Sequence, residues 1–141
     1  MIAVVVDTNT LVSGLGWSGP PSVIVDALLA GGLVLVSSPP LLDELERVLL
    51  YPKLAHVFDD PAGTTALVRS VADVVEPTST LAAVADEPDN RVLEAAVEAG
   101  VDAVVTGDAG LLALVEFQGI PVMSAAKFLK WWAEKEPPAA E

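Results

Sequence analysis

The feature that most constrains the fold is a series of short apolar runs that alternate with segments of helical character. The chain opens with an uninterrupted run, residues 2–6, that is rich in β-branched side chains and ends at Asp7. Such a run is typical of a strand buried on both faces. Shorter apolar runs follow at 33–36, 74–76, 103–106 and 120–123. Strands that alternate with helices form parallel sheets through right-handed crossovers. The sequence therefore predicts an α/β fold, a single-domain three-layer α/β/α sandwich with a mostly parallel sheet of about five strands.

Caps and prolines place the helices between these runs. Ser38 as N-cap, followed by Pro39, predicts a helix to about Leu50. Other helices are expected at 22–30, 61–72, 88–99, 108–115 and 124–135, with a turn or two at 53–58. Three glycines and two prolines after the first strand predict a loop there: Gly14, Gly16, Gly19, Pro20 and Pro21. We expect residues 1–136 to form the domain and 137–141 to be a frayed tail.

Composition excludes several classes of protein. Hydrophobic residues make up 52% of the 141 residues and charged residues 19%, which excludes intrinsic disorder. There is no cysteine and only one histidine, His56, so disulfides, thiolate zinc sites and polyhistidine metal sites are excluded. No apolar run approaches the roughly 18 residues that span a bilayer, and no basic segment precedes Asp7. We therefore expect a cytoplasmic protein with no membrane segment.

The charge balance is strongly acidic. Twenty Asp and Glu residues against seven Lys and Arg residues give a formal net charge of -13. Such a field repels phosphate backbones, so nucleic-acid binding through a basic patch is not expected. The balance suits either a basic protein partner or a site where a few carboxylates meet at a divalent cation. Most of the acids are expected simply to face solvent on helix surfaces.

Two acids stand directly after strands. Asp7 follows the first strand, and Asp108 follows the apolar run that ends near Thr106. Either one could be only a turn residue or a helix cap. In a doubly wound sheet, however, the carboxyl ends of the strands gather at one edge, and ligands bind where the strand order reverses. If the first and fourth strands are adjacent, the two carboxylates are neighbours.

A third acid lies on a helix face that should be buried. The apolar stripe of the helix at 88–99 consists of Val92, Leu93, Ala96 and Val97. Asp89 projects onto the middle of this stripe, and a buried carboxylate is costly unless it is paired or bound to metal. Arg91, Glu94 and Glu98 project to the opposite side, where we expect ordinary solvated charges.

The helix at 39–50 offers a fourth acid but does not identify it. Its apolar stripe consists of Leu41, Leu42, Leu45, Val48 and Leu49. Asp43 points away from this stripe, while Glu44 and Glu46 lie on its two flanks. Helical geometry therefore excludes Asp43 and leaves Glu44 and Glu46 open. Glu46 is the more easily explained as a surface partner of Arg47 or Lys53.

Four segments together carry a family resemblance. They are VVVDTN, LLDELERVL with YPKL, EPDNRVLEAA and VVTGDAGLLAL. With these motifs in this order, nearly the whole chain resembles a PIN-domain ribonuclease, in the group of VapC-like toxins of toxin-antitoxin systems. The resemblance implies an acidic quartet at Asp7, Glu44, Asp89 and Asp108, which selects Glu44 over Glu46. It also implies supporting positions at Asn9 and Thr106, and it matches Asn90 to a DN pair of unassigned role.

Four carboxylates without a basic or thiol partner imply a bound cation. Oxygen ligands favour Mg²⁺ or Mn²⁺ over zinc. The hypothesis is a metal-dependent endoribonuclease in which Asp7 is the central ligand and Asp89 and Asp108 complete the shell, directly or through water. Glu44 would bind the metal through water or orient the nucleophile. The resemblance further implies products with 5′-phosphate and 3′-hydroxyl ends.

The sequence also suggests partners. The resemblance implies RNA as substrate and a cognate antitoxin whose C-terminal segment, often with an arginine, enters the acidic pocket. The few cations that could hold RNA, though solubility is their more ordinary role, are Arg47, Lys53, Lys127 and Lys130. Trp132 projects onto the apolar stripe of the last helix, whereas Trp131 projects away from it. We therefore hypothesise a homodimer with Trp131 at its interface.

Competing interpretations are distinguished by single positions. A receiver-type phosphotransfer domain would have a second acid beside Asp7, where Thr8 stands. A haloacid-dehalogenase-like phosphatase would have Asp in place of Asn9. The alternative from another class is a non-catalytic acidic module that sequesters a basic protein. Such a module would show no metal-dependent nuclease activity. His56 is interpreted as a packed or surface residue.

Overall fold

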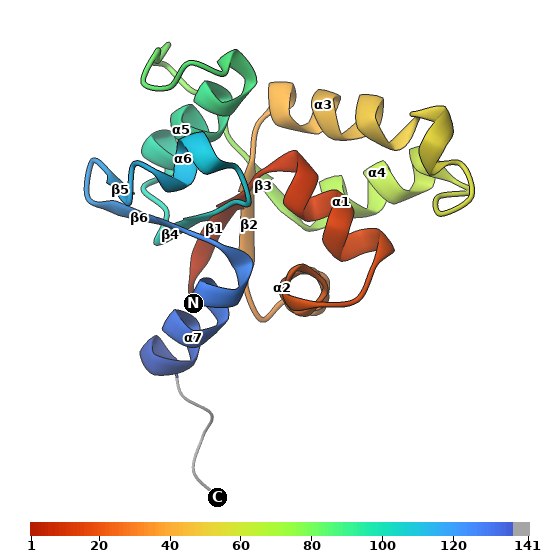
Figure 1. The fold of residues 1–141 in the computed structure, drawn as a ribbon, viewed down its shortest axis with the longest axis horizontal. Coiled ribbons are helices and arrows are strands. Elements are labelled where there is room, and N and C mark those ends of the chain that lie inside the picture. Colours follow the sequence, from red (N-terminus) through yellow and green to blue (C-terminus); the bar gives the residue numbers. More distant parts are fainter. Residues whose placement is uncertain (137–141) are drawn as a thin grey trace, which may run out of the picture.

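The computed structural model describes residues 1–136, so the expected tail at 137–141 lies outside the described residues. Within this range six strands form one sheet in the order β3-β2-β1-β4-β6-β5 (Figure 1). The strands are β1 (Ala3–Val6), β2 (Val34–Ser37), β3 (Ala72–Val74), β4 (Ala103–Val105), β5 (Glu116–Phe117) and β6 (Ile120–Met123). All neighbouring strands are parallel except β5, which is antiparallel to β6. The predicted α/β class is confirmed, with one more strand than expected.

Helices cover both faces of the sheet (Figure 1). One layer contains α1 (Thr8–Gly16), α2 (Pro20–Ala30), α3 (Pro39–Leu49), α4 (Pro61–Val71) and α7 (Ala125–Lys135). The other contains α5 (Glu87–Ala99) and the short α6 (Ala109–Leu112), and the short 3-10 helix η1 (Pro52–Leu54) follows α3. Among the described helices, none has both the length and the apolar character needed to cross a membrane.

The central strand β1 divides the core between these two layers. Val4 and Val6 pack in the cluster that includes residues of α1, α2 and α7, while Val5 packs in the cluster that includes residues of α5. This alternation is the two-residue period of a strand with both faces covered. An uninterrupted apolar run at the start of the chain therefore corresponds to a fully buried strand, as predicted.

The segment directly after β1 is a helix, so the predicted loop is wrong except at residues 17–19, where Gly19 has a positive φ. Helix α1 begins directly after Asp7, and Gly14 and Gly16 lie within it. A Cβ at Gly14 would lie 2.5 Å from the backbone oxygen of Pro21, so this glycine permits close contact between α1 and α2. Pro20 and Pro21 form the first turn of α2, where proline is tolerated.

Other departures are smaller. Strand β3 begins two residues before the predicted run at 74–76, and the helix predicted at 108–115 ends at Leu112. Strand β5 was not predicted; Gln118 and Gly119, both with positive φ, turn the chain back into β6. The side chain of Ser38 makes no capping hydrogen bond, although α3 begins at Pro39 as expected. The turn or two predicted at 53–58 is limited to η1.

Trp131 is not the exposed residue that helical projection suggested. Trp131 and Trp132 are both half-buried and pack against the larger core cluster. The ring of Phe128 lies 5.7 Å from that of Trp131 and 6.1 Å from that of Trp132, measured between centroids. The homodimer therefore stays a prediction and loses its original argument, because Trp131 already has partners within its own chain.

Candidate active site

Strands β1 and β4 are neighbours in the sheet, as the candidate site requires. Val6 is the partner of Val105 in the parallel register, and the backbone N–H of Asp7 donates to the carbonyl oxygen of Val105 at 3.1 Å. Asp7 and Thr106 therefore leave the sheet side by side at its carboxyl edge. The strand order reverses at β1, so this edge is the crevice where α/β proteins bind ligands.

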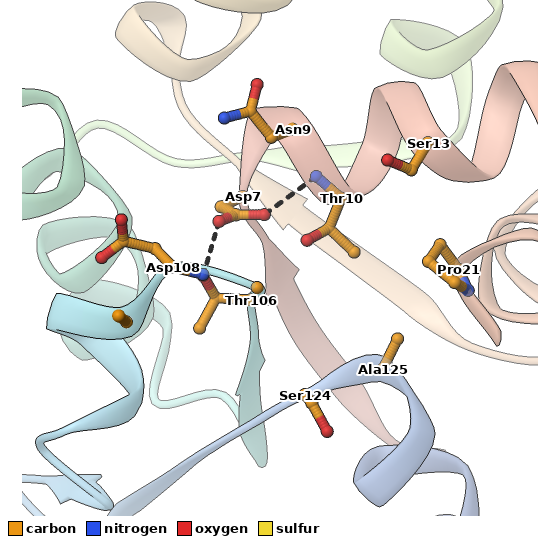
Figure 2. A pocket seen from close by; sticks show the side chains of 11 residues that line it. Asp7, Asn9, Thr10, Ser13, Pro21, Thr106, Asp108, Ser124 and Ala125 are labelled. Atoms are coloured by element: carbon orange, nitrogen blue, oxygen red, sulfur yellow. Dashed lines mark hydrogen bonds between the residues drawn. The ribbon is translucent and has the colours of Figure 1, made fainter.

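The hydroxyl of Thr106 joins the two acids that follow these strands (Figure 2). It donates to Oδ2 of Asp7 and accepts from the backbone N–H of Asp108 at 3.0 Å. The other oxygen of Asp7 accepts from the N–H of Thr10 at 3.0 Å and caps α1, and Asp7 is only 6% exposed. Oδ2 of Asp108 accepts from the N–H of Leu111 at 2.9 Å and caps α6. Both carboxylates are thus fixed before any ligand arrives.

All four acids of the predicted quartet line one cavity of about 350 Å³, which we call the acidic cavity. Its lining residues are Asp7, Thr8, Asn9, Glu44, Val48, Tyr51, Asp86, Pro88, Asp89, Val92 and Asp108. The acids come from the end of β1, from α3, from the start of α5 and from the loop after β4. The structure therefore brings together side chains that are separated by up to 101 positions in the sequence.

The structure separates the two glutamates that helical geometry left open. Glu44 is half-buried and lines the acidic cavity. Glu46 is exposed and lines a different groove, together with Arg69 of α4. Asp43 is exposed and does not line the acidic cavity. Of the acids on α3, Glu44 alone faces the other members of the quartet.

Asp89 is the carboxylate under most electrostatic strain. It is half-buried, and its Oδ2 has no hydrogen-bond partner among the described residues. Burial, a side-chain contact with Asp108, and the negative charges of Asp108, Asp86 and Asp7 raise the pKa of Asp89 to about 7. Two ionised carboxylates cannot donate to each other, so this contact requires either a proton or a cation.

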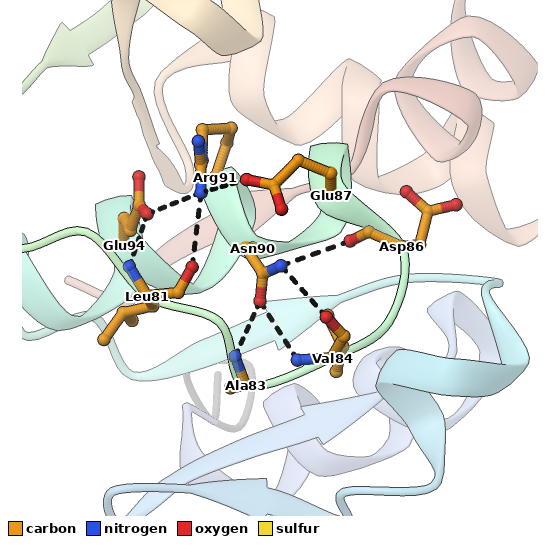
Figure 3. A network of polar contacts seen from close by, with 8 residues as sticks. All are labelled: Leu81, Ala83, Val84, Asp86, Glu87, Asn90, Arg91 and Glu94. Atoms are coloured by element: carbon orange, nitrogen blue, oxygen red, sulfur yellow. Dashed lines mark hydrogen bonds and ion pairs between the residues drawn. The ribbon is translucent and has the colours of Figure 1, made fainter.

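Asn90 acts on the loop before α5 and does not line the acidic cavity (Figure 3). Its side chain is fully buried; the amide oxygen accepts from the N–H groups of Ala83 and Val84, and the amide nitrogen donates to the carbonyl oxygens of Val84 and Asp86. These bonds hold the segment that carries Asp86 against α5. Asn90 therefore positions the rim of the cavity.

The prediction of solvated charges on the outer side of α5 is wrong for two residues. Glu94 is buried and accepts from the N–H of Leu81 at 2.8 Å, and Arg91 pairs with Glu94 and Glu87, both at 2.9 Å (Figure 3). The loop before α5 folds back over this side of the helix and covers it. Helical projection could not anticipate this because the covering segment has no regular structure.

A second cavity of about 420 Å³ adjoins the first and shares Asp7, Asn9 and Asp108 with it (Figure 2). We call it the hydroxyl-lined cavity because its other polar side chains are Thr10, Ser13, Thr106 and Ser124. Asn9 is exposed and lies where the two cavities meet. Asp7 and Asp108 therefore line both cavities, and the other polar side chains of the hydroxyl-lined cavity carry no charge.

Comparison with known families agrees with this geometry. The sequence model of a family described as "PIN domain" matches residues 3–110, which include all four acids of the acidic cavity. The chain belongs to the PIN-domain family. PIN domains are generally nucleases that act on RNA and use divalent metal ions, so a nuclease is supported at the level of the family.

The fold agrees with a solved structure. The chain is similar to the crystal structure of PAE2754 from Pyrobaculum aerophilum, with a TM-score of 0.59 and 19% sequence identity. The similarity covers 94% of this chain and 90% of that one. At this identity the likeness concerns the fold alone. A comparison with curated proteins found no match.

The donor set of this PIN domain suits a hard cation that keeps part of its water shell. Within residues 1–136, no three His, Cys, Asp or Glu side chains are grouped so that they could hold a metal ion as they stand. The cavity nevertheless offers only oxygen ligands, and Oδ2 of Asp89 is buried without a partner. Mg²⁺ commonly binds through one or two carboxylates and several waters, which fits these residues better than a closed cage of ligands.

Asp86 and Tyr51 are among the lining residues of the acidic cavity that were not predicted as site residues of this PIN domain. Asp86 precedes α5 and adds a fifth carboxylate to the cavity. Tyr51 lies seven residues after Glu44, with Val48 between them. Tyr51 lies beyond the end of α3, in extended backbone directly before η1, so helical spacing from Glu44 could not have predicted its position.

Proposed function

We propose that this PIN domain is a divalent-metal-dependent endoribonuclease and the toxin of a toxin-antitoxin pair. Asp7, Glu44, Asp89 and Asp108 form its catalytic and metal-binding site, with Mg²⁺ or Mn²⁺ as the cofactor. The observation that carries the proposal is the acidic cavity, in which carboxylates from four segments face one another and one of them has a pKa near 7. Repulsion among these carboxylates raises the free energy of the metal-free folded protein, and a bound cation removes this repulsion.

Each residue has a distinct task in this proposal. Asp7 is the most firmly held acid, because both its oxygens accept hydrogen bonds and it is buried. Asp108 and Asp89 complete the acidic wall, and Thr106 sets the distance between Asp7 and Asp108. Glu44, on α3, orients the attacking water from the opposite side of the cavity. A divalent cation held by these carboxylates would supply activation of the attacking water and stabilisation of the leaving oxygen in hydrolysis of the phosphodiester.

The acidic cavity also suits the proposed antitoxin. A C-terminal segment with an arginine would meet up to five carboxylates there, and guanidinium groups bind carboxylates in a bidentate manner. The net charge of -13 would accelerate the approach of a basic segment. The same segment would block the site for RNA, so inhibition and binding would coincide.

The experiment compares two neighbouring glutamates on α3. We expect Glu44→Gln to lower kcat on RNA by a factor of about 100 or more, since it removes a group that acts in the transition state. Glu46→Gln is the matched control and should leave kcat unchanged, because Glu46 faces another groove. Cleavage is measured on single-stranded and structured RNAs with Mg²⁺, with Mn²⁺ and with EDTA.

Asp7→Asn and Asp89→Asn should abolish cleavage while circular dichroism shows retained secondary structure. Equal activity of the Glu44 and Glu46 variants would contradict the assignment of the quartet. Absence of metal-dependent cleavage in the unaltered protein, together with tight binding of a basic peptide, would instead support the acidic binding module.

A further inference from the structure

We propose that Tyr51 and Lys53 form a binding site for one unpaired nucleotide of the substrate, in which the base stacks on the ring of Tyr51. The inference rests on the proposed ribonuclease function and goes beyond it, because it assigns two residues outside the acidic quartet to the binding of RNA. Tyr51 is the only tyrosine of the chain. It lines the acidic cavity together with the quartet and is 41% exposed.

The backbone around Tyr51 is firmly held. Its N–H donates to the carbonyl oxygen of Val48 at 3.0 Å, and its own carbonyl oxygen accepts from the N–H of Leu54 at 2.9 Å. Pro52 follows directly and opens η1. The backbone that carries the ring is therefore fixed at the rim, and binding of a base would not have to order this turn.

A cation accompanies the ring. The Nζ atom of Lys53 lies 6.0 Å from the centroid of the Tyr51 ring, and Lys53 is exposed. Arg47, four residues before Tyr51, lines the groove next to the acidic cavity, with which that groove shares Glu44 and Pro88. The chain has only seven Lys and Arg residues, so two near one rim are a notable local concentration.

Charge alone cannot hold RNA on this protein. The net charge of -13 opposes a polyanion, and the acidic cavity repels phosphate until cations enter it. Stacking of a base on an aromatic ring is insensitive to this field and is worth about 1–3 kcal/mol per base. A tyrosine beside the proposed reaction centre can therefore attract RNA through base stacking, although the net charge of the protein repels it.

Stacking on a protein ring requires a base that has left its own helix. In a duplex the base faces are covered by neighbouring bases, and exposing one costs a few kcal/mol. Single-stranded segments and loops pay much less of this cost. The Tyr51–Lys53 pair is therefore expected to favour cleavage next to an unpaired nucleotide.

The first experiment measures steady-state cleavage of single-stranded RNA and of duplex RNA. Tyr51→Leu should raise KM for the single strand by about 5- to 150-fold, which corresponds to the loss of one stacked base, with kcat within about twofold. Tyr51→Phe keeps the ring and should match the original protein. Trp17→Leu is a control, because it removes an aromatic side chain that is also exposed but lies outside both cavities. Lys53→Gln should lower the slope of log KM against the logarithm of the salt concentration by about 0.7, because one phosphate contact is lost.

The second experiment does not depend on catalysis. A single-stranded oligonucleotide that contains 5-iodouridine is photocrosslinked in MgCl₂ to the Glu44→Gln protein, in which cleavage is expected to be slow, and tryptic peptides are identified by mass spectrometry. The crosslink should fall on the peptide of residues 48–53, which contains Tyr51. It should disappear in Tyr51→Leu and persist in Trp17→Leu.

The two experiments separate failure of this inference from failure of the proposed function. Metal-dependent cleavage with an unchanged KM in Tyr51→Leu, or crosslinks only outside residues 48–53, would overturn the stacking site and leave the ribonuclease standing. An equal rise of KM for single-stranded and duplex RNA would also overturn it. A crosslink at Tyr51 without any metal-dependent cleavage would support the nucleotide site and contradict the ribonuclease.

Discussion

At the scale of single residues, one hydroxyl group organises the candidate site. Thr106 is fully buried, donates to Asp7 and accepts from the backbone of Asp108. A serine could make the same bonds, but the β-branched threonine has fewer rotamers to lose when it is fixed. The resemblance to PIN domains predicted Thr106 as a supporting residue, and the structure shows the contacts through which it can act. Thr106 therefore acts on both acids: its hydroxyl donates its hydrogen to Asp7, and its oxygen accepts from the backbone N–H of Asp108.

Asp89 makes the stability of the metal-free protein depend on pH. Its pKa is raised from 3.8 to about 7, so between these values the folded chain binds a proton that the unfolded chain does not. The resulting stabilisation is complete below the unfolded pKa and is lost as the pH rises through about 7. In EDTA we expect the free energy of unfolding to fall from pH 6 to pH 8, by less than about 1 kcal/mol because solvent reaches part of the group.

Urea denaturation of the original protein and of Asp89→Asn, at both pH values, tests this expectation. The variant cannot ionise at this position and should show a smaller decline than the original protein. The difference between the two proteins isolates Asp89 from every other group that titrates in the range. An equal decline of the free energy of unfolding in both proteins would show that ionisation of Asp89 does not destabilise the folded state.

At the scale of elements, the sequence predicted those features whose cause is local. Strand β1 and the proline-opened helices α3 and α4 lie within one or two residues of their predicted bounds, because apolar runs, caps and proline act on neighbouring residues. The loop predicted at Gly14 failed because the reason for that glycine is tertiary: it accommodates α2. The misjudged Arg91 and Glu94 have a similar cause, since an irregular segment covers them.

The contact between α1 and α2 gives a test of this interpretation of Gly14. An alanine Cβ at position 14 would lie 2.5 Å from both the backbone oxygen of Pro21 and Cγ2 of Val25. Alanine gains up to about 1 kcal/mol of helix propensity over glycine, but overpacking against backbone costs about 1–3 kcal/mol. We expect Gly14→Ala to lower the free energy of unfolding by about 1–2 kcal/mol.

Gly32→Ala is the matched control for this measurement. A Cβ there would be 3.6 Å from its nearest neighbour, which is ordinary contact, so its effect should stay within about 0.5 kcal/mol. Chemical denaturation of the three proteins decides the matter. A stabilised Gly14→Ala variant would mean that the two helices can separate without cost and that the glycine has another role.

At the scale of the whole molecule, topology creates the candidate site. Asp7 and Asp108 are 101 positions apart, and they meet only because β1 pairs with β4. The sequence could predict that both acids follow strands, and it could predict their proximity once that pairing was assumed. It could not choose between Glu44 and Glu46 by geometry, because both flank one stripe and only the placement of α3 over the sheet edge separates them.

The same topology concentrates negative charge where the chain is already acidic, and this makes a bound cation a determinant of stability. A ligand that binds only the folded state stabilises it by about 2.7 kcal/mol at a hundredfold excess over its Kd. For a chain of 141 residues this corresponds to a rise in Tm of about 8 °C. We expect MgCl₂ or MnCl₂ to raise Tm by more than NaCl of equal ionic strength, because NaCl screens the net charge of -13 without entering the acidic cavity specifically.

Asp108→Asn should lose this excess, whereas Glu46→Gln should retain it although it removes the same charge from the chain. If both variants respond to the divalent salt as the original protein does, the stabilisation comes from the general field of the surface, and the acidic cavity does not bind the ion.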